Sequence, residues 1–453
     1  MMGVRSYVPY YQTLGRLGTP IVVGQLGTIV LAFADTLMIG HHSTVELAAA
    51  AFVNTVFTLV LIFALGFSYA ITPMVGTLFG RGEHGRVGEV VRNALLANLL
   101  LAAVLMVVCG IVYLNVGRLG QPEELLPHIR PYFIIQLVSL PFVCGFNAYK
   151  QFADGITDTT LPMVVIILGN LLNIFGNWVL IYGVFGLPEL GLVGAGLSTL
   201  FSRMVMMAML ACVFFFQRKY RDYALGFKAG KINGKDMKSL LRMGIPLAIQ
   251  MGTETAAFSL SGIMVGWLGT TQLAAHQVML TISQLGYMVY YGVGAATAVR
   301  VSYFVGQREY VRAGRTAYAA LHIVLALSVA ISIPLFLSRH VIGYLFTDNA
   351  EVAMLVSTVF LPFVVYQFGD SMQIVFANAS RGLSHVRPLM FIAIFSYFIV
   401  SLPVGYLLGI EMGFGLRGIW FAFPFGLTVA GILYWLAFRK KLLALKGQPG
   451  AVQ

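Results

Sequence analysis

Three acidic residues lie within long apolar stretches of the sequence, where a carboxylate is costly. They are Asp35 in FADTLMIG, Glu254 in QMGTETAAF and Asp370 in YQFGDSMQ; the other 14 of the 17 acidic residues fall in loops or at the edges of such stretches. An ionised carboxylate at bilayer depth costs about 2.5 kcal/mol or more, so it normally faces a partner or a polar path. Arg203 is the one basic residue expected at that depth, so an ion pair can neutralise at most one of the three acids. We therefore expect at least two of them to serve an ion or a substrate.

The side chains beside these acids offer the oxygen atoms that a hard cation needs. Tyr366 and Asp370 are four residues apart and would share a helix face, and Thr253 and Thr255 flank Glu254. Hard cations such as Na⁺ bind several oxygens, and burial also allows a carboxyl group to hold a proton near neutral pH. A cationic substrate and a small cation that compete for the same acids would be exchanged for one another. This is antiport in its simplest physical form.

Amide side chains in the stretch LGNLLNIFGNWVL add further polar groups. Asn173 and Asn177 are four residues apart, so they could present two amides to one site or hydrogen-bond between helices. Arg203 could line a cavity or anchor neighbouring helices, and we favour the structural role. The sequence contains no Walker A, G-x-S-x-G or His/Glu metal pair, and its three cysteines lack ligand spacing. Nothing here predicts an enzyme, a cofactor or a structural metal.

The elements that position these residues are predicted to be membrane-spanning helices. Of 453 residues, 58% are hydrophobic and 10% are charged, where a soluble domain has roughly 25% charged residues. Twelve apolar stretches of about 20 residues or more are each long enough to cross a bilayer as a helix. With a cytoplasmic N-terminus, 24 of the 29 Lys and Arg residues fall inside and four outside. The sequence therefore predicts an all-α polytopic protein of the cell inner (cytoplasmic) membrane with twelve transmembrane helices and both termini in the cytoplasm.

The chain repeats itself at an offset of 226 residues. Matching pairs are Gly18 and Gly244, Pro20 and Pro246, Gly66 and Gly292, and Arg86 and Arg312. Each half holds six predicted spans, an even number, so the halves enter the membrane in the same direction and are related by a pseudo-two-fold axis along its normal. The acids break the symmetry, since Asp35 corresponds to Ser261 and Glu254 to Thr28. We predict an N-terminal six-helix lobe at 1–216, a basic cytoplasmic linker at 217–238, a C-terminal six-helix lobe at 239–440 and a cytoplasmic tail at 441–453.

Taken together, these features resemble the multidrug and toxic compound extrusion (MATE) family, and within it the NorM-type bacterial branch. The likeness runs from about Leu14 to Lys440. It rests on the duplication, FADTLMIG with SGIMVG, ELAAA with QLAAHQ, GNLLNIFGNWVLIYGVFG, and Glu254 with YQFGDS. The resemblance implies a secondary active antiporter with two lobes around a central cavity. It would export organic cations and amphipathic toxins by alternating access in exchange for inward Na⁺, which we favour over H⁺.

The resemblance also implies roles for individual residues. Glu254, Tyr366 and Asp370 would bind Na⁺ in the C-terminal lobe; Asp35, Asn173, Asn177 and Thr199 would form a coupling cluster in the N-terminal lobe; Gln277 and Tyr287 would line the substrate path. Asp348 matches an acidic position outside the membrane, but Asn349 follows where some relatives carry a second acid. The implied partners are small cationic or amphipathic drugs, the coupling ion and membrane lipids. No cofactor and no nucleic acid are expected, and the protein is expected to be a monomer.

A lipid-linked saccharide flippase of the same two-lobed superfamily is the alternative function. Such an anionic substrate would require a basic cavity. The charges expected at bilayer depth are instead three acids, Asp35, Glu254 and Asp370, and one base, Arg203. This charge balance favours the antiporter.

Overall fold

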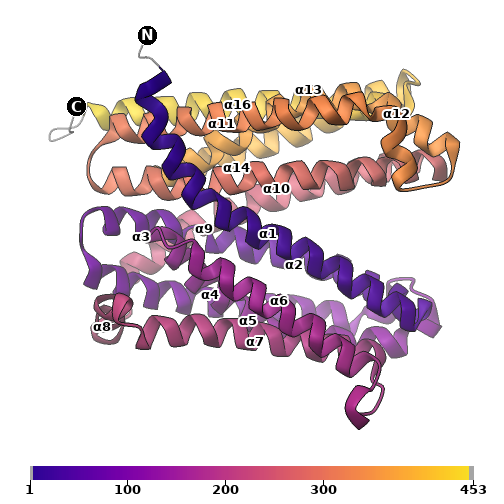
Figure 1. The fold of residues 1–453 in the computed structure, drawn as a ribbon, viewed down its shortest axis with the longest axis horizontal. Helices are drawn as coiled ribbons and strands as arrows, with labels where there is room; N and C mark the ends of the chain where they lie inside the picture. Colours follow the sequence, from indigo (N-terminus) through magenta and orange to yellow (C-terminus); the bar gives the residue numbers. More distant parts are fainter. Residues whose placement is uncertain (1–3, 448–453) are drawn as a thin grey trace. The chain divides into compact units, whose positions relative to one another are not determined.

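The computed structural model describes residues 4–447, and helices cover nearly all of that range (Figure 1). The main helices are α1 (Val8–His42), α2 (Thr44–Ser68), α3 (Ile71–Gly80), α4 (His84–Leu114), α5 (Leu126–Gly155), α6 (Thr160–Ile181), α7 (Gly191–Phe216), α8 (Arg221–Ala229), α9 (Gly234–Gly266), α10 (Thr270–Gly306), α11 (Tyr310–Leu337), α12 (Arg339–Ile342), α13 (Ala350–Gly382), α14 (Arg387–Ile394), α15 (Leu402–Tyr406) and α16 (Gly415–Lys446). Short 3₁₀ turns are η1 (Val4–Tyr7), η2 (Val116–Arg118), η3 (Glu123–Leu125), η4 (Val184–Gly186), η5 (Arg218–Tyr220) and η6 (Gly343–Leu345), and π-helical segments are η7 (Phe395–Ser401) and η8 (Leu407–Glu411). No strand occurs in the described range, as the sequence predicts.

Within the described residues, ten helical segments are long and apolar enough to cross a membrane. Some of them combine consecutive elements, such as α2 with α3 at Thr44–Gly80 and the run from α14 to η8 at Arg387–Glu411. The helices α9 and α10, with 33 and 37 residues, are also long enough to cross a membrane, but they carry more polar side chains than those ten segments. Together with the ten they make twelve long helical segments. The twelve-helix, all-α prediction is confirmed, and its two most polar members are the helices that carry Glu254 and Tyr287.

Packing divides the described chain into two compact units. The N-terminal unit is Val23–Ala248, and the C-terminal unit combines the chain up to Val22 with the chain from Ile249 onward. The two breaks fall inside α1 and α9 and lie 226 residues apart, the offset of the sequence repeat. The opening stretch of each repeat thus packs in the other repeat's unit. The predicted lobes at 1–216 and 239–440 follow the duplication rather than this packing, and their boundaries stay a prediction.

Close contacts at glycine hold these opening stretches in place. In the C-terminal unit, a Cβ on Gly18 of α1 would lie 3.3 Å from the carbonyl oxygen of Gly292 in α10. In the N-terminal unit, a Cβ on its repeat mate Gly244 in α9 would lie 2.9 Å from the carbonyl oxygen of Phe67 in α2. Small residues let helices approach this closely. The same packing device therefore occurs at equivalent places in both repeats.

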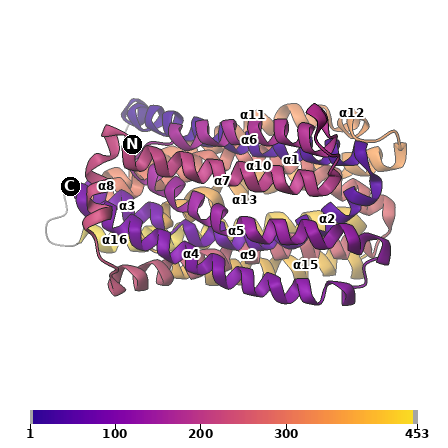
Figure 2. The same ribbon diagram turned by 90° about the horizontal axis from the view of Figure 1, so that it is seen from below.

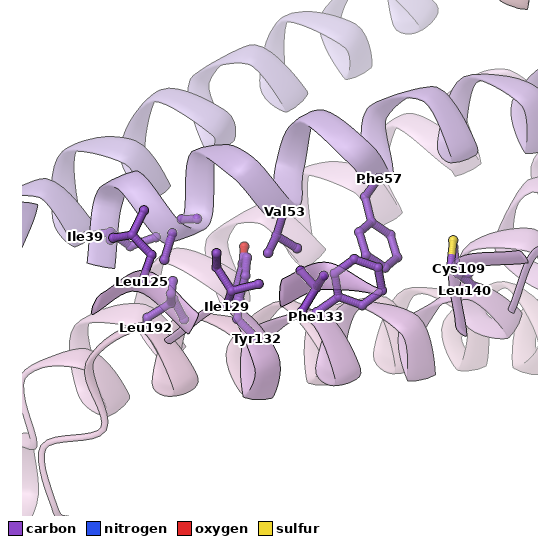
Figure 3. Packing of buried hydrophobic residues seen from close by; sticks show 14 of the residues in the cluster. Ile39, Val53, Phe57, Cys109, Leu125, Ile129, Tyr132, Phe133, Leu140 and Leu192 are labelled. Carbon is purple, nitrogen blue, oxygen red and sulfur yellow. The ribbon is translucent and has the colours of Figure 1, made fainter. Parts of the chain in front are cut away.

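Helix α5 is the centre of the N-terminal unit, where it packs against α2, α4 and α7. Figure 2 shows α6 running alongside α7 in the same unit. Phe57 of α2 meets Phe133 of α5 edge to face, with ring centroids 5.0 Å apart, and Cys109 and Leu140 belong to the same buried cluster (Figure 3). This apolar packing fixes α2 and α5 in place. Polar side chains from α1, α6 and α7 are assembled beside it.

Helix α13 is the centre of the C-terminal unit, where it packs against α10, α11 and α16 (Figure 1). Trp420 of α16 is buried there and donates a hydrogen bond to His276 of α10 over 3.1 Å. The segment η7, which contacts α16, has π-helical geometry that rotates its side chains relative to a regular helix. Its Tyr397 is buried and reaches α13.

The predicted basic linker at 217–238 is largely folded. It contains η5, α8 and the start of α9, and α8 packs against α4 in the N-terminal unit. Arg92 of α4 donates a hydrogen bond to the Gly230 carbonyl oxygen over 2.6 Å, and Arg86 pairs with Asp236 over 2.6 Å. The predicted tail at 441–453 begins within α16, which ends at Lys446, and residues 448–453 lie outside the described chain.

Candidate cation-binding site

The Asp35 cluster lies in the N-terminal unit and gathers polar side chains from three helices. Asn177 of α6 donates a hydrogen bond over 2.6 Å to the carboxylate of Asp35 in α1. Asn177 also donates to Asn173 Oδ1 over 3.2 Å, and Asn173 contacts the Thr199 hydroxyl of α7 at 3.1 Å. Both asparagines are fully buried, while Asp35 is partly exposed. The structure therefore brings all four residues named from the sequence into one cluster.

The Asn173 amide can serve this cluster in either of its two orientations. Turned over, its nitrogen donates to Asp35 Oδ1 over 3.0 Å and its oxygen accepts from the backbone N–H of Thr199 over 3.2 Å. Ser202 adds a hydroxyl 3.5 Å from the Asn173 amide. The cluster thus surrounds one carboxylate with neutral amides and hydroxyls. Such a donor set holds the carboxylate in position without cancelling its charge.

Arg203 lies near the Asp35 cluster but forms no ion pair with Asp35 in the described chain. Its guanidinium donates to Gln136 Oε1 over 2.8 Å and to the Ser139 hydroxyl over 2.5 Å, both on α5. Its charge still acts on Asp35 through space. These bonds tie α7 to α5, which agrees with the structural role favoured from the sequence, and they leave Asp35 without a salt bridge.

The Glu254 cluster lies in the C-terminal unit and is also built from neutral amides. Gln373 of α13 donates to Glu254 Oε1 over 2.9 Å, and Gln250, one turn earlier in α9, donates to the same oxygen over 3.4 Å. Gln373 is itself fixed by Tyr397 of η7, whose hydroxyl donates to the Gln373 Oε1 over 2.9 Å. Glu254 therefore keeps its carboxylate beside α13 with no basic residue paired to it in the described chain.

Asp370 lies on α13, three residues before Gln373, and its side chain is buried, with 5% exposed. Within residues 4–447 its carboxylate makes no hydrogen bond and no ion pair, and its through-space electrostatic partner is Glu254. Tyr366, one turn away on the same helix, pairs its hydroxyl with that of Ser283 on α10 and packs against Trp420. The structure thus brings Glu254, Tyr366 and Asp370 into one region of the C-terminal unit.

The two residues predicted for the substrate path are placed differently. Tyr287 of α10 lies within electrostatic range of both Glu254 and Asp370 and packs near Tyr291, with ring centroids 6.1 Å apart. Gln277 lies on the same helix, is exposed, and makes no side-chain hydrogen bond to either acid in the part of the chain described. Tyr287 is thus the member of the pair that the fold places beside the cation-binding candidates.

Asp348 lies in the loop that precedes α13. Asp348 is exposed, and Asn349 after it caps α13 by accepting hydrogen bonds from the backbone N–H of Glu351 over 2.9 Å and of Val352 over 3.3 Å. Asparagine is a strong N-cap residue. Asn349 therefore stabilises the helix that carries Tyr366 and Asp370.

Sequence reasoning missed several charged residues that the fold buries. Lys150 and Asp154 of α5 form a buried ion pair of 2.8 Å, and Arg381 of α13 and Glu46 of α2 are also buried. Asp154 and Glu46 are among the 14 acids that the sequence places in loops or at the edges of apolar stretches, but α5 continues past its apolar part to Gly155. Arg203 is consequently one of several basic groups inside the fold. The i, i+4 spacing of Lys150 and Asp154 was the signal available in the sequence.

The comparison with known protein families identifies the chain. The sequence model of the MatE family matches residues 20–179 and again residues 246–407, and the two matches begin 226 residues apart. The probable multidrug resistance protein NorM of Xanthomonas axonopodis pv. citri (strain 306) is 31% identical over 430 residues, which cover 95% of this chain and 94% of that protein. The double match confirms the internal duplication.

Solved structures share the fold at low sequence identity. The Vibrio cholerae MATE transporter VcmN has a TM-score of 0.89 at 18% identity, over 98% of this chain and 100% of that one. A Pyrococcus furiosus transporter of the MOP superfamily, described as having a binding pocket of reverse polarity, has a TM-score of 0.87 at 20% identity, over 97% of each chain. The chain belongs to the MatE family and is a multi-pass membrane transporter, not an enzyme.

Proposed function

We propose that this transporter is a multidrug efflux antiporter that exports organic cations and amphipathic toxins in exchange for inward Na⁺. The name of its Xanthomonas relative, a probable multidrug resistance protein, supports the export of drugs. The buried carboxylates support the cationic character of the cargo. On this proposal the protein works as a monomer in the inner membrane by alternating access, with both termini in the cytoplasm, and needs no cofactor besides the coupling ion.

The observation that carries the proposal is the state of Asp370. A buried carboxylate with neither a hydrogen bond nor an ion pair is strongly unfavourable unless a proton or a cation neutralises it. Asp370 has neither within the described chain, and the acid that acts on it through space, Glu254, carries the same sign of charge. Two neighbouring carboxylates repel one another, so a cation bound near them is favourable. A bound Na⁺ or a bound organic cation would each relieve the repulsion.

Exchange follows from competition for this charge. The partners of Glu254 are the amides of Gln373 and Gln250, which hold it in place but supply no positive charge. Na⁺ entering from outside and a drug cation from the cytoplasm would each neutralise the same carboxylate charge. Since both cannot do so at once, the binding of one favours the release of the other. Asp35 with its neutral amides offers a second carboxylate of this kind in the N-terminal unit.

The experiment is efflux of an ethidium-like cation from energised cells carrying single neutralised acids. We expect Glu254→Gln and Asp370→Asn to abolish efflux while the protein remains folded and in the membrane. Glu351→Gln is the matched control, because Glu351 is an exposed acid on the same helix as Asp370. Undiminished efflux in both site variants would refute the coupling role of these acids.

A binding measurement separates this proposal from the flippase alternative. An antiporter with acidic sites binds organic cations, whereas a lipid-linked saccharide flippase binds an anionic polyprenyl phosphate. Direct binding of both ligand types to the purified protein gives the ranking. A preference for the polyprenyl phosphate that survives Asp370→Asn would favour the alternative.

A further inference from the structure

Two buried polar side chains near Asp370 lack hydrogen-bond partners. The amide of Gln367 on α13 is 1% exposed, and neither its nitrogen nor its oxygen has a partner among the described residues. The hydroxyl of Tyr290 on α10 is fully buried and also makes no well-formed hydrogen bond there. The Ser328 hydroxyl of α11 lies nearby but outside hydrogen-bond geometry, and it donates to the Val324 carbonyl oxygen over 2.8 Å and contacts the Ser371 hydroxyl at 2.6 Å. Leaving such groups unpaired costs about 1–3 kcal/mol each, so an additional partner is expected.

The two unpartnered groups face the same small space beside Gly286. A Cβ built on Gly286 of α10 would lie 3.6 Å from Gln367 Nε2 and 3.8 Å from the Tyr290 hydroxyl oxygen, with nothing nearer. These are ordinary contact distances, so the space accepts a group of methyl size without a clash. A water molecule or a partly dehydrated small cation is of comparable size. The amide can present its oxygen to this space, because the two ends of a glutamine amide are interchangeable by rotation.

This space lies on the Asp370 side of α13. Gln367 and Asp370 are three residues apart on that helix and therefore neighbours on one face. Tyr290 is within electrostatic range of Asp370, and α10 packs directly against α13. The Asp370 carboxylate, the Gln367 amide and the Tyr290 phenol therefore come from the two packed helices α13 and α10 and act in the same part of the C-terminal unit. Oxygen ligands of mixed charge are the set that a hard monovalent cation prefers.

We propose that the space between Gly286, Tyr290 and Gln367 completes a Na⁺ site, in which Gln367 Oε1 and the Tyr290 hydroxyl join the Asp370 carboxylate as ligands. The inference rests on the proposed sodium-coupled function and extends it to two ligands and one glycine that neither the motifs nor the family likeness singles out. Gly286 is the residue that keeps the space open. Water molecules supply the remaining oxygens of the ion's shell.

The test measures Na⁺ binding to the purified full-length protein rather than transport. A ligand that binds the folded state raises its stability with concentration, so thermal unfolding at increasing NaCl, with KCl holding ionic strength constant, yields the Na⁺ affinity. Gly286→Ala places a methyl group in the space, and Gln367→Leu removes the amide. Gly262→Ala is the control, since its Cβ would lie 3.6 Å from His276 Nε2 in the same unit. We expect both site variants to weaken Na⁺ binding by about ten-fold or more and the control to leave it unchanged.

Each outcome decides between the inference and the proposed function. If Asp370→Asn loses the Na⁺ response while Gly286→Ala and Gln367→Leu keep the wild-type affinity, the extended site is wrong and the role of Asp370 stands. If wild type and Asp370→Asn respond alike to Na⁺, sodium binding at Asp370 itself fails. A variant that unfolds in KCl alone is replaced by Tyr290→Phe, which removes one oxygen and keeps the ring.

Discussion

The side-chain amide of Asn177 donates a hydrogen bond of 2.6 Å to the carboxylate of Asp35, from α6 to α1. The bond orients a charged group with a neutral one, and Arg203 nearby is occupied by Gln136 and Ser139. Asp35 therefore stays available to a cation while its position is fixed. The same design recurs at Glu254 in the other repeat, with Gln373 in place of Asn177.

Asn177→Ala should weaken the dependence of transport on Na⁺. A hydrogen bond to a charged group contributes about 1.5–3 kcal/mol, so its loss lets the carboxylate leave its position and lowers Na⁺ affinity about ten-fold or more. The measurement is ethidium export against Na⁺ concentration in proteoliposomes. Asn115→Ala is the control, because the Asn115 amide donates to the backbone oxygen of Ile111 and touches no acid. Identical Na⁺ curves for Asn177→Ala and wild type would contradict the role of the Asp35 cluster.

Gln373 and Tyr397 should have graded effects on Glu254. Gln373→Leu removes the 2.9 Å bond to Glu254, whereas Tyr397→Phe removes the phenol that orients Gln373 and leaves that bond possible. We expect the loss of Na⁺-driven export to be larger for Gln373→Leu than for Tyr397→Phe. Equal loss in the two variants, with equal amounts of folded protein, would mean that Gln373 does not act on Glu254 directly.

The buried ion pair of Lys150 and Asp154 should affect the stability of the folded protein rather than transport. Lys150→Met leaves Asp154 buried beside an apolar side chain, and removing one partner of a buried pair costs about 3–5 kcal/mol. The double variant Lys150→Met with Asp154→Leu should recover much of that loss, because no charge is left unpaired. Thermal unfolding in detergent measures both.

The control for this pair is Arg312→Met, which breaks the partly exposed pair of 2.9 Å with Glu309. Exposed pairs contribute about 0–1 kcal/mol, so this variant should unfold close to the wild-type temperature. A double variant less stable than Lys150→Met alone would show that Lys150 and Asp154 are held by their other contacts rather than by one another.

Asp158 links the start of the linker to the turn between α5 and α6 and predicts a pH dependence. Burial tends to raise the pKa of Asp158, but hydrogen bonds from Lys219 and Tyr220 outweigh it and hold this pKa below its usual value. A carboxyl group with a lowered folded-state pKa stabilises the protein fully above the unfolded-state pKa of about 4, and this contribution is lost as the pH falls through the folded-state value.

Asp158→Asn should therefore cost about 1 kcal/mol or less at neutral pH, since Lys219 is largely exposed and its pairing is screened. The difference in unfolding temperature between wild type and variant should narrow as the pH falls below about 4 and vanish below the folded-state pKa of Asp158. Asp222→Asn, at an exposed acid of α8, should show no such pH-dependent difference. A difference for Asp158→Asn that persists unchanged at low pH would rule out the charge of Asp158 as its cause.

The sequence predicts the members of each cluster that share a helix or a motif, and it misses those that only the fold brings close. Asn173 with Asn177, and Tyr366 with Asp370, follow from four-residue spacing along one helix. Gln373 and Tyr397 could not be linked to Glu254, because they come from α13 and η7 while Glu254 lies on α9. A polar residue in an apolar stretch signals depth, but it carries no information about which face of which neighbouring helix it meets.

The compact units could not be predicted from the sequence either. The repeat places the halves at a 226-residue offset, and the structure confirms the duplication, yet the opening stretches of α1 and α9 pack outside their own repeats. The cause is local: Gly18 and Gly244 allow backbone contacts with Gly292 and Phe67 that a larger residue would prevent. Hydropathy identifies each helix but does not predict where two helices approach one another this closely.

The most direct measurement imposes a Na⁺ gradient at constant pH on proteoliposomes containing the purified protein and a cationic dye. The account predicts that inward Na⁺ movement drives dye export in wild type, and that Glu254→Gln and Asp370→Asn lose this response while the control Glu351→Gln keeps it. Dye movement that ignores the Na⁺ gradient, and is unchanged when both acids are neutralised, would contradict the claim that these buried carboxylates exchange one cation for another.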